Sequence, residues 1–238
     1  GVLATAAALR ALEAAATRPG EISHLVTASC SGFSAPGFDI DLIERLGLSP
    51  TVSRTHVGFM GCHAAMNALR IADAFASADG DARVLVCAAE LCTLHCQYGW
   101  NPDVVLSNAL FADGAAAAVC SGLGRVDGWS LKRSGSVLIS DSREAMTWRV
   151  GDHGFEMTLS SRVPELIATH LKPWLTRWLA PSGLGIDEVK SWAAHPGGPR
   201  ILQAAGETLD LPPLALEASR PILADFGHMS LPLVPFGP

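Results

Sequence analysis

The hydrophobic pattern of the first half of the chain alternates between helix-like segments and short apolar runs. Residues 2–17 are rich in Ala and Leu and end at Arg18-Pro19-Gly20, which predicts a helix. Further helices are predicted at 39–46, 62–79 and 106–111. Buried strands are predicted at 22–29, 51–57, 82–89 and 115–120. This order predicts an α/β fold with a mixed, largely parallel sheet covered by helices on both sides.

The second half has one strong helical pattern and several weaker ones. Residues 163–179 place apolar side chains at helical spacing and predict an amphipathic helix. A further helix is expected at 200–209, and strands are expected at 129–140 and 186–194. Residues 141–157 are polar, with a turn at 151–154, and residues 221–238 are apolar and rich in Pro and Gly.

Composition narrows the class of protein. Hydrophobic residues make up 49% and charged residues 17% of the 238 residues, so a sizeable core is expected. The net charge of −6 argues against nucleic-acid binding. No apolar run is long enough for a membrane span, and the first residues lack a secretory layout. Because the six cysteines lie in apolar stretches, we expect reduced thiols in a cytoplasmic protein.

Cys62 is the first candidate for chemistry. It lies between an apolar run that ends in glycine and a long segment of strong helix formers. Free N–H groups and the helix dipole favour an anion at a helix start, and such a position can lower a thiol pKa from about 8.5. Cys62 is therefore a candidate nucleophile. The alternative is an inert core cysteine, because free cysteines are among the most buried residues.

Two histidines beside glycines could act with this thiol. His195 follows the apolar run at 186–194 and precedes Pro196-Gly197-Gly198-Pro199, and His228 follows Gly227. Ends of strands in α/β sheets are common sites for ligands and catalytic groups. The glycines Gly197 and Gly198 would let a ligand approach closely. A Cys–His–His constellation is one hypothesis. Two hydrogen-bonded structural histidines are the other, because spacing does not show that the three residues meet.

A group of three cysteines and one histidine could be taken for the ligands of a zinc ion. Cys87, Cys92, His95 and Cys96 lie within ten residues, but their spacing matches no standard paired-ligand pattern. Cys87 also lies inside a predicted buried strand. We therefore predict no metal site.

Four motifs, in this order, resemble the type III polyketide synthases, the chalcone and stilbene synthase-like enzymes, in a bacterial form. They are Gly61-Cys62-His63-Ala64-Ala65-Met66-Asn67, Leu110-Phe111-Ala112-Asp113-Gly114, Ala194-His195-Pro196-Gly197-Gly198-Pro199 and Gly227-His228-Met229-Ser230. The resemblance implies a layered αβαβα thiolase-like fold of two related halves, 1–122 with the cysteine and 123–238 with the histidines. It also implies a homodimer, coenzyme A thioester substrates and no metal or redox cofactor.

The resemblance also assigns roles to the three candidates. Cys62 matches the acyl-carrying nucleophile, and His195 matches the histidine that activates the thiol and polarises the extender thioester. His228 stands where the family has asparagine. A neutral imidazole N–H can still donate to an enolate oxygen. Because an unperturbed histidine has a pKa of about 6.5, we expect His228 to add a pH dependence between roughly 5.5 and 7.5.

The same comparison predicts several substrate-binding residues. Cys30 stands where plant members carry a threonine, and Cys96 and Met157 match two phenylalanines that guard the coenzyme A tunnel. These replacements suggest a roomy entrance that admits a fatty-acyl starter. Compared with the family, the sequence lacks an N-terminal segment, and a helix and turn are missing between Ser230 and Leu231.

The resemblance implies an acyltransferase that condenses malonyl-CoA with a starter. Cys62 takes an acyl group from an acyl-CoA, malonyl-CoA loses CO2, and the enolate attacks the Cys62 thioester to build a pyrone or phenolic polyketide. A single-round ketoacyl synthase of the fatty-acid initiation type is one alternative, although Pro196-Gly197-Gly198 differs from its usual motif. A catalytically silent thiolase-fold subunit is the other; the missing asparagine favours it, and the intact Cys62 and His195 do not.

Overall fold

The structure is a computed structural model that describes residues 1–122 and 128–230. The described residues form two compact units that interleave along the sequence. Unit 1 comprises residues 1–92, 112–122, 128–134 and 229–230, and unit 2 comprises residues 93–111 and 135–228. The chain therefore passes between the units several times. The halves 1–122 and 123–238 do not coincide with these units and stay a prediction.

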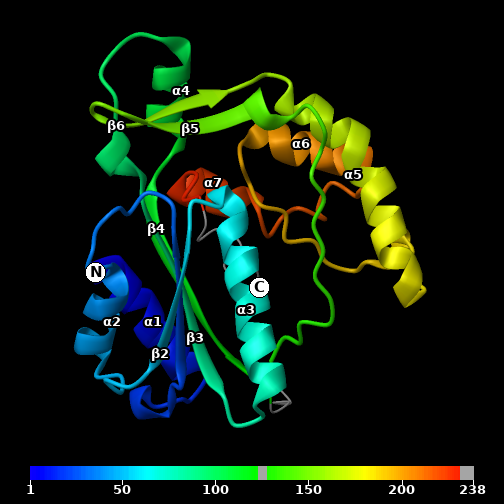
Figure 1. Ribbon diagram of the computed structural model, residues 1–238. Helices are drawn as coiled ribbons and strands as arrows, with labels where there is room; N and C mark the ends of the chain where they lie inside the picture. Colours follow the sequence, from blue (N-terminus) through cyan, green and yellow to red (C-terminus); the bar gives the residue numbers. More distant parts are fainter. Residues whose placement is uncertain (123–127, 231–238) are drawn as a thin grey trace. The chain divides into compact units, whose positions relative to one another are not determined.

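Unit 1 is built on a four-stranded sheet with the order β2-β1-β3-β4 (Figure 1). The central strand β1 (His24–Ser29) pairs in parallel with β2 (Ser53–Gly58) and with β3 (Arg83–Leu91). The edge strand β4 (Asp113–Ser121) pairs antiparallel with β3. These strands confirm the predicted mixed sheet, with boundaries that differ by at most two residues.

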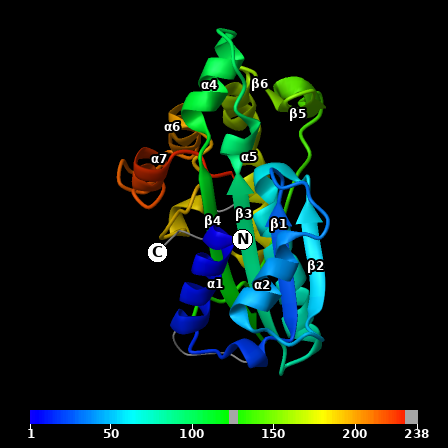
Figure 2. The same cartoon turned by 90° about the vertical axis from the view of Figure 1, so that its left-hand side faces the viewer.

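Alternate residues of β1 and β3 point to two different helical layers. Val26 and Ala28 pack with Ala68 and Ala72 of α3 (Ala64–Ala78), whereas Leu25 packs on the opposite face. That face is covered by α1 (Val2–Ala14) and α2 (Phe38–Leu46), as Figure 2 shows. Burial on both faces explains why these strands are continuous apolar runs in the sequence.

Unit 2 contains helices and one hairpin. The hairpin joins β5 (Met146–Gly151) to β6 (Gly154–Leu159) in antiparallel register. The helices are α4 (Pro102–Leu110), α5 (Val163–Leu179), α6 (Pro199–Thr208) and α7 (Arg220–Phe226). Leu175 and Leu179 of α5 form a core with Leu209 at the end of α6, which confirms the predicted amphipathic helix. None of the described helices has the length and apolar character needed to cross a bilayer.

Several short 3₁₀ turns complete the described secondary structure. They are Pro19–Glu21, Gly61–His63, Cys92–His95, Arg143–Ala145, Ala180–Ser182 and Ile186–Glu188.

Two predicted strands are wrong. Residues 128–142 contain no strand in the described part of the chain, and the run at 186–194 begins with a 3₁₀ turn and then has no regular structure. In that turn the carboxylate of Glu188 accepts the N–H of Gly185 at 2.6 Å. A strand needs a neighbouring backbone for its hydrogen bonds, and an apolar run does not show whether one exists.

The hairpin and the start of α4 were not predicted. The sequence places a turn at 151–154 but no strands beside it, because residues 146–159 mix polar and apolar side chains. Helix α4 begins at Pro102, four residues before the predicted start, because the Asn101 side chain accepts the N–H of Asp103 at 2.9 Å. An Asn cap followed by Pro at the first helical position is a favoured helix start.

Candidate active site

In unit 1, Cys62 lies in a sharp turn between β2 and α3. The turn begins after Gly58, places Phe59 at φ 56° and Gly61 at φ 61°, and continues through the 3₁₀ segment Gly61–His63 into α3. The predicted position of Cys62 at a helix start is therefore confirmed. A bulky residue such as Phe59 rarely adopts positive φ, and such strained residues cluster at functional sites.

The surroundings of the Cys62 thiol favour its protonated form. Its Sγ lies 3.5 Å from Oγ of Ser230, a residue that also has positive φ. Burial raises the pKa of the Cys62 thiol, and the nearby Glu90 carboxylate raises it further, while the Ser230 hydrogen bond lowers it. The expectation that the helix start lowers this pKa is therefore wrong. The desolvation of a buried thiolate exceeds the favourable effect of the helix end.

Cys30 lies beside this turn, at the end of β1. Only 5% of the residue is exposed, and its thiol donates to the Gly61 carbonyl oxygen at 3.7 Å. Burial, followed by the charge of Glu90, raises the pKa of Cys30 to about 11. Cys30 therefore contacts the backbone of the Cys62 turn as a protonated thiol.

In unit 2, His195 and His228 form a hydrogen-bonded pair. Their Nε2 atoms lie 3.1 Å apart, with the two rings nearly perpendicular. His228 is 1% exposed, and its backbone N–H donates to the Leu110 carbonyl at 2.8 Å. The ring of Phe111 contacts the His228 ring edge to face at 4.5 Å. The structure thus brings together two residues that are 33 positions apart in the sequence.

Both imidazoles of the pair are neutral at physiological pH. Burial lowers the pKa of His195 to about 4. Burial, together with the charge of a protonated His195, lowers the pKa of His228 to about 3. The Nε2–Nε2 hydrogen bond requires an unprotonated nitrogen on at least one of the two rings, so they are never both imidazolium ions in this arrangement. The expected titration of His228 between 5.5 and 7.5 is therefore wrong for the folded protein, because burial moves it to lower pH.

The two predicted glycines beside His195 differ in how strictly the structure requires glycine at each position. Gly198 begins α6 with φ 142°, a conformation that side chains rarely adopt. A Cβ on Gly197 would lie 3.8 Å from ring atoms of both His195 and His228, which is an ordinary contact. The backbone therefore requires glycine at position 198. At position 197 a Cβ could be accommodated, so the packing does not require glycine there.

The predicted tunnel residues lie in different settings. Met157 is half-buried on β6 and pairs with Trp148 of β5. Trp148 belongs to an aromatic cluster with Phe111, Phe155 and His95, and Phe111 extends it to His228. Cys96 is exposed after the Cys92–His95 turn. Among the described residues, neither Met157 nor Cys96 makes a hydrogen bond or ring contact with the histidine pair, and their substrate-binding roles stay a prediction.

Three residues of these sites were not predicted to act there. Phe111 lies in one of the motifs that carry the family resemblance, and this position in the sequence could have indicated that it belongs to the site. Ser230 likewise stands in the motif of His228. Glu90, which accepts hydrogen bonds from the backbone of Cys30 and Ser31, had no signal beyond a charged residue at the end of an apolar strand.

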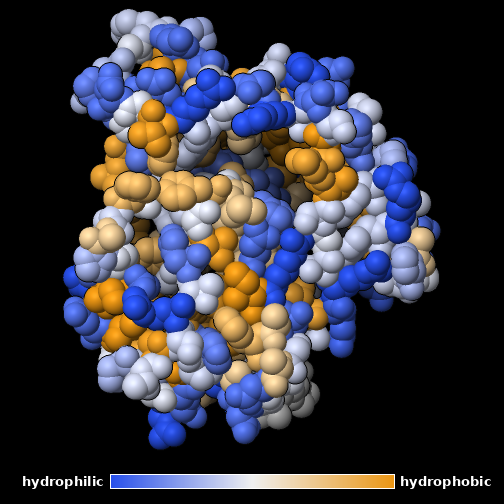
Figure 3. Space-filling view, in the orientation of Figure 1, coloured by the Kyte–Doolittle hydropathy of each residue, from blue (hydrophilic) through white to orange (hydrophobic). Residues whose placement is uncertain are grey.

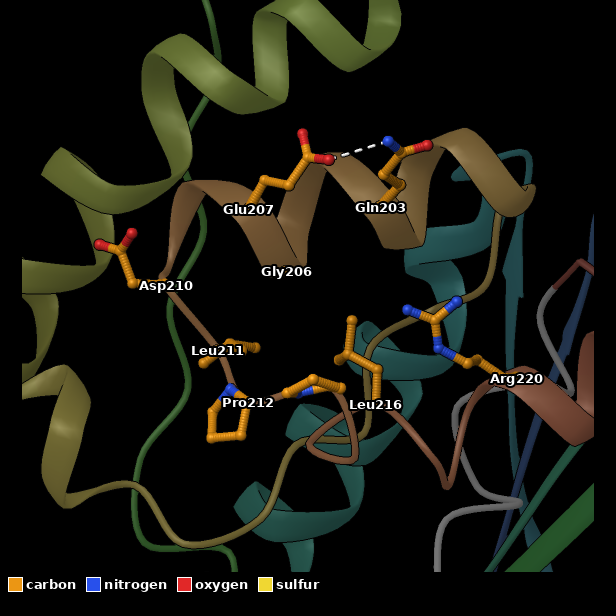
Figure 4. A pocket seen from close by; sticks show the side chains of 9 residues that line it. Gln203, Gly206, Glu207, Asp210, Leu211, Pro212, Leu216 and Arg220 are labelled. Atoms are coloured by element: carbon orange, nitrogen blue, oxygen red, sulfur yellow. Dashed lines mark hydrogen bonds between the residues drawn. The ribbon is translucent and has the colours of Figure 1, made fainter.

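Unit 2 also contains a pocket of about 360 Å³ beside α6 (Figure 4). It is lined by polar side chains of Gln203, Glu207 and Arg220 and by the apolar Leu216. None of the predicted site residues lines it. We therefore place the candidate chemistry at the histidine pair and at the Cys62 turn, not in this pocket.

Comparison with known families identifies the class. The model of the chalcone and stilbene synthase N-terminal domain matches residues 2–123, and that of the C-terminal domain matches residues 130–236. The chain therefore belongs to the chalcone and stilbene synthase family, and the predicted family and thiolase-like fold class are confirmed.

Individual relatives refine this assignment. The chain is 36% identical over 233 residues to the alpha-pyrone synthesis polyketide synthase-like Pks18 of Mycobacterium tuberculosis, covering 95% of this chain and 59% of that protein. It is also 36% identical over 233 residues to the 1,3,6,8-tetrahydroxynaphthalene synthase of Streptomyces peucetius, covering 96% of this chain and 62% of that one. The chain thus spans about three fifths of the length of these relatives.

Solved structures agree with the sequence comparison. The crystal structure of PKS-I from the brown alga Ectocarpus siliculosus matches with a TM-score of 0.94 and 34% identity, covering 98% of this chain and 62% of that chain. The 1,3,6,8-tetrahydroxynaphthalene synthase of Streptomyces coelicolor, a bacterial type III polyketide synthase, matches with a TM-score of 0.91 and 32% identity. That match covers 98% of this chain and 66% of the other.

Proposed function

We propose that the protein is a type III polyketide synthase that condenses malonyl-CoA with an acyl group carried on Cys62. One observation carries the proposal. Cys62 contacts Ser230 in unit 1, and Ser230 is separated by a single residue from His228 of the histidine pair. Consecutive Cα atoms are 3.8 Å apart, so the chain keeps the Cα atoms of His228 and Ser230 within about 7.6 Å. We therefore assign the three residues to one reaction, in which Cys62 carries the acyl group and the two histidines act on the thioesters.

The raised pKa of Cys62 and the lowered pKa of His195 mean that both groups are neutral before the substrate reacts. Burial favours the neutral form of Cys62 and of His195. Transfer of the thiol proton to a nitrogen of His195 creates a thiolate and an imidazolium, and each charge stabilises the other. The thiolate then attacks the carbonyl carbon of an acyl-CoA. The carbon–sulfur bond to coenzyme A breaks, the coenzyme A sulfur takes the proton, and the acyl group remains on Cys62.

The neutral histidines suit the second step. When malonyl-CoA loses CO2, negative charge develops on its thioester oxygen. Neutral N–H donors aimed at that oxygen stabilise the enolate without adding a second reactive acid. We assign this role to His195 and His228, which exchange their mutual Nε2–Nε2 hydrogen bond for bonds to the thioester oxygen when the substrate binds. The enolate carbon attacks the Cys62 thioester, forms a carbon–carbon bond and releases the Cys62 sulfur, so the chain grows by two carbons.

Coenzyme A thioesters are the proposed substrates, and the proposed chemistry needs no metal or redox cofactor. The names of the two curated relatives, an alpha-pyrone synthesis protein and a tetrahydroxynaphthalene synthase, support a pyrone or phenolic product. All six cysteines are free thiols in the structure, which supports a reducing compartment such as the cytoplasm.

We further propose a homodimer. Phe33 and Phe59 contact each other at 5.7 Å in unit 1 while 82% and 57% of their respective surfaces are exposed. Met60, next to Phe59 in the Cys62 turn, is 51% exposed. We call Phe33, Phe59 and Met60 the aromatic patch. Figure 3 also shows apolar residues on the visible surface of the protein. Such exposure is common and does not by itself indicate a partner. An aromatic pair beside the nucleophile is a more specific signal for contact with a second chain.

Mass spectrometry tests the proposed function. The protein is incubated with malonyl-CoA and a panel of acyl-CoAs, and intact protein and products are analysed. We expect one acyl adduct, which is lost in Cys62→Ala, and polyketide products that need both substrates. His228→Ala should still load the acyl group, but it should decarboxylate malonyl-CoA about 10²–10³ times more slowly, the usual effect of removing one oxyanion donor.

Other outcomes distinguish the competing functions. An adduct that persists in Cys62→Ala would contradict the nucleophile. Products with a single extension only would indicate a ketoacyl synthase. Absence of both loading and decarboxylation in the folded parent protein would support a catalytically silent subunit. Cys120→Ala serves as the control, because Cys120 lies on β4 and has no proposed role.

A further inference from the structure

Glu90 is a fully buried carboxylate in an apolar row of unit 1. It continues the row Val84, Val86 and Ala88 of β3, which faces α3, and its own exposed fraction is 0%. Burial raises the pKa of Glu90, while its hydrogen bonds to Ser31, Cys30 and Ser29 lower it. An ionisable group in such a row destabilises the fold unless its partners compensate. The partners of Glu90 are therefore informative.

The partners of Glu90 lie at the end of the neighbouring strand β1, and they all donate hydrogen bonds. The N–H groups of Cys30 and Ser31 donate to its carboxylate at 3.0 and 2.8 Å. The Ser31 hydroxyl donates to the same carboxylate, while it accepts the N–H of Leu91 at 2.7 Å. A backbone N–H group cannot accept a hydrogen bond from a protonated carboxyl group, so this arrangement suits the ionised carboxylate, which only accepts.

These bonds continue to the nucleophile through Cys30. The backbone of Cys30 is held by Glu90, and its thiol donates to the carbonyl oxygen of Gly61. Gly61 directly precedes Cys62 and has positive φ, so the direction of its carbonyl determines how the turn enters the 3₁₀ segment. Glu90, Cys30 and Gly61 thus connect three segments of unit 1, namely the ends of β3 and β1 and the Cys62 turn.

We propose that Glu90 is a positioning residue for Cys62: its carboxylate fixes the backbone of residues 30 and 31, and the Cys30 thiol fixes the turn at Gly61. This inference rests on the proposed role of Cys62 as the nucleophile. Glu90 itself is not proposed to touch the substrate. Its negative charge has a second effect, because it raises the pKa of both the Cys30 and the Cys62 thiols. The effect of Glu90 on the position of Cys62 and the effect of its charge on the thiol pKa can be separated experimentally.

The test measures alkylation of Cys62 by iodoacetamide as a function of pH, with peptide mapping to separate the six cysteines. The plateau rate at high pH reports access to the thiol, and the midpoint reports its pKa. In Glu90→Gln, the amide NH₂ group faces hydrogen-bond donors, so the 30–31 segment should loosen. We expect a plateau rate about tenfold higher, as expected when a hydrogen bond to a charged group is lost, and a lower midpoint because the charge is removed.

Variants of Cys30 test whether Glu90 acts on the Cys62 turn through the hydrogen bond from Cys30 to Gly61. Cys30→Ala keeps the Glu90 charge but loses the donor to Gly61, so it should raise the plateau rate without lowering the midpoint. Cys30→Ser keeps a donor and should restore a rate near that of the parent. The double variant Glu90→Gln/Cys30→Ala should show little further increase in rate, because both changes interrupt the same path. Glu21→Gln is the matched control, since this exposed carboxylate also accepts a backbone N–H, that of Arg18 at 2.8 Å, but before the start of β1.

Two results would overturn the proposal. If Glu90→Gln shifts the midpoint and leaves the plateau rate unchanged, Glu90 acts only through its charge. If Glu90→Gln does not fold, Cys30→Ala decides alone, and an unchanged plateau rate in that variant rejects the positioning path. Because alkylation requires no coenzyme A substrate, these results are independent of whether the protein makes a polyketide.

Discussion

Three reactive groups of the candidate site are held neutral by burial. The thiol of Cys62 has a raised pKa, and the imidazoles of His195 and His228 have lowered pKa values. A neutral donor can stabilise a developing negative charge at any physiological pH. His228 can therefore perform the task of an amide N–H, although histidine is ordinarily a pH-sensitive residue.

The lowered pKa of His228 predicts how stability depends on pH. The unfolded chain titrates this imidazole near pH 6.5 and the folded protein near 3, so the unfolded state binds more protons between these values. The contribution of His228 to stability is complete above about pH 6.5 and is lost as the pH falls towards 3. The slope from this residue should be about 1.4 kcal/mol per pH unit.

Chemical denaturation at a series of pH values between 7 and 4 measures this slope. His228→Asn should give a shallower loss of stability with acid than the parent protein, because asparagine does not titrate. His170→Asn is the control, since His170 is exposed on α5. Equal slopes for His228→Asn and the parent would contradict the burial of an unprotonated imidazole.

At the scale of elements, the position of Cys62 depends on how closely α3 approaches the sheet. Five alanines of α3 face the core, and each is at most 6% exposed: Ala64, Ala65, Ala68, Ala72 and Ala76. Because these side chains are small, the helix lies close to β1 and β3. The start of α3, and with it the Cys62 turn, is therefore positioned by the packing of the whole helix.

Ala72→Leu should destabilise unit 1. Ala72 is 0% exposed in the core between α3 and the sheet, so a larger side chain must displace its neighbours. We expect a loss of about 1–3 kcal/mol in the free energy of unfolding. Ala74→Leu on the exposed face of the same helix provides the control, because it adds the same atoms without displacing the core. Urea denaturation compares the two, and equal stabilities would contradict the close packing of α3.

At the scale of the whole molecule, the interleaved units mean that neither forms from one continuous segment. Unit 1 needs β4 and Ser230 from later parts of the chain, and unit 2 needs residues 93–111 from the first half. Ser230 is the last described residue, and it follows His228 of unit 2 after a single residue. In the sequence, only Met229 thus separates the residue that contacts Cys62 from the histidine pair.

The aromatic patch predicts the oligomeric state. Phe33→Asp places a charge in the proposed contact between two chains, so it should shift a dimeric parent protein towards monomer. Leu214→Asp is the control, because Leu214 is equally apolar and 73% exposed but belongs to unit 2. Light scattering after size-exclusion chromatography measures the mass. A parent protein that is monomeric at every concentration tested would contradict the proposed dimer.

Local patterns in the sequence determined most of unit 1 and the choice of candidate site residues. Strands with both faces buried are continuous apolar runs, and α3 is a run of helix formers, so β1, β3 and α3 were predicted from their own residues. Cys62, His195 and His228 were identified because they stand in motifs with a specific order. Such signals are local, and the structure reproduces the elements that carry them, except for the strand expected before His195.

Only the tertiary structure decided the strands of unit 2, the partners of Glu90 and the pKa directions. The run at 186–194 contains apolar residues as a strand would, but hydrogen-bonded neighbours determine whether a strand forms. Glu90 gains its function from Cys30 and Ser31, which are about 60 residues away in the sequence. The pKa values of Cys62 and His228 depend on desolvation, which is set by everything packed around a group. These properties belong to the surroundings of a residue, and the sequence specifies those surroundings only through the complete fold.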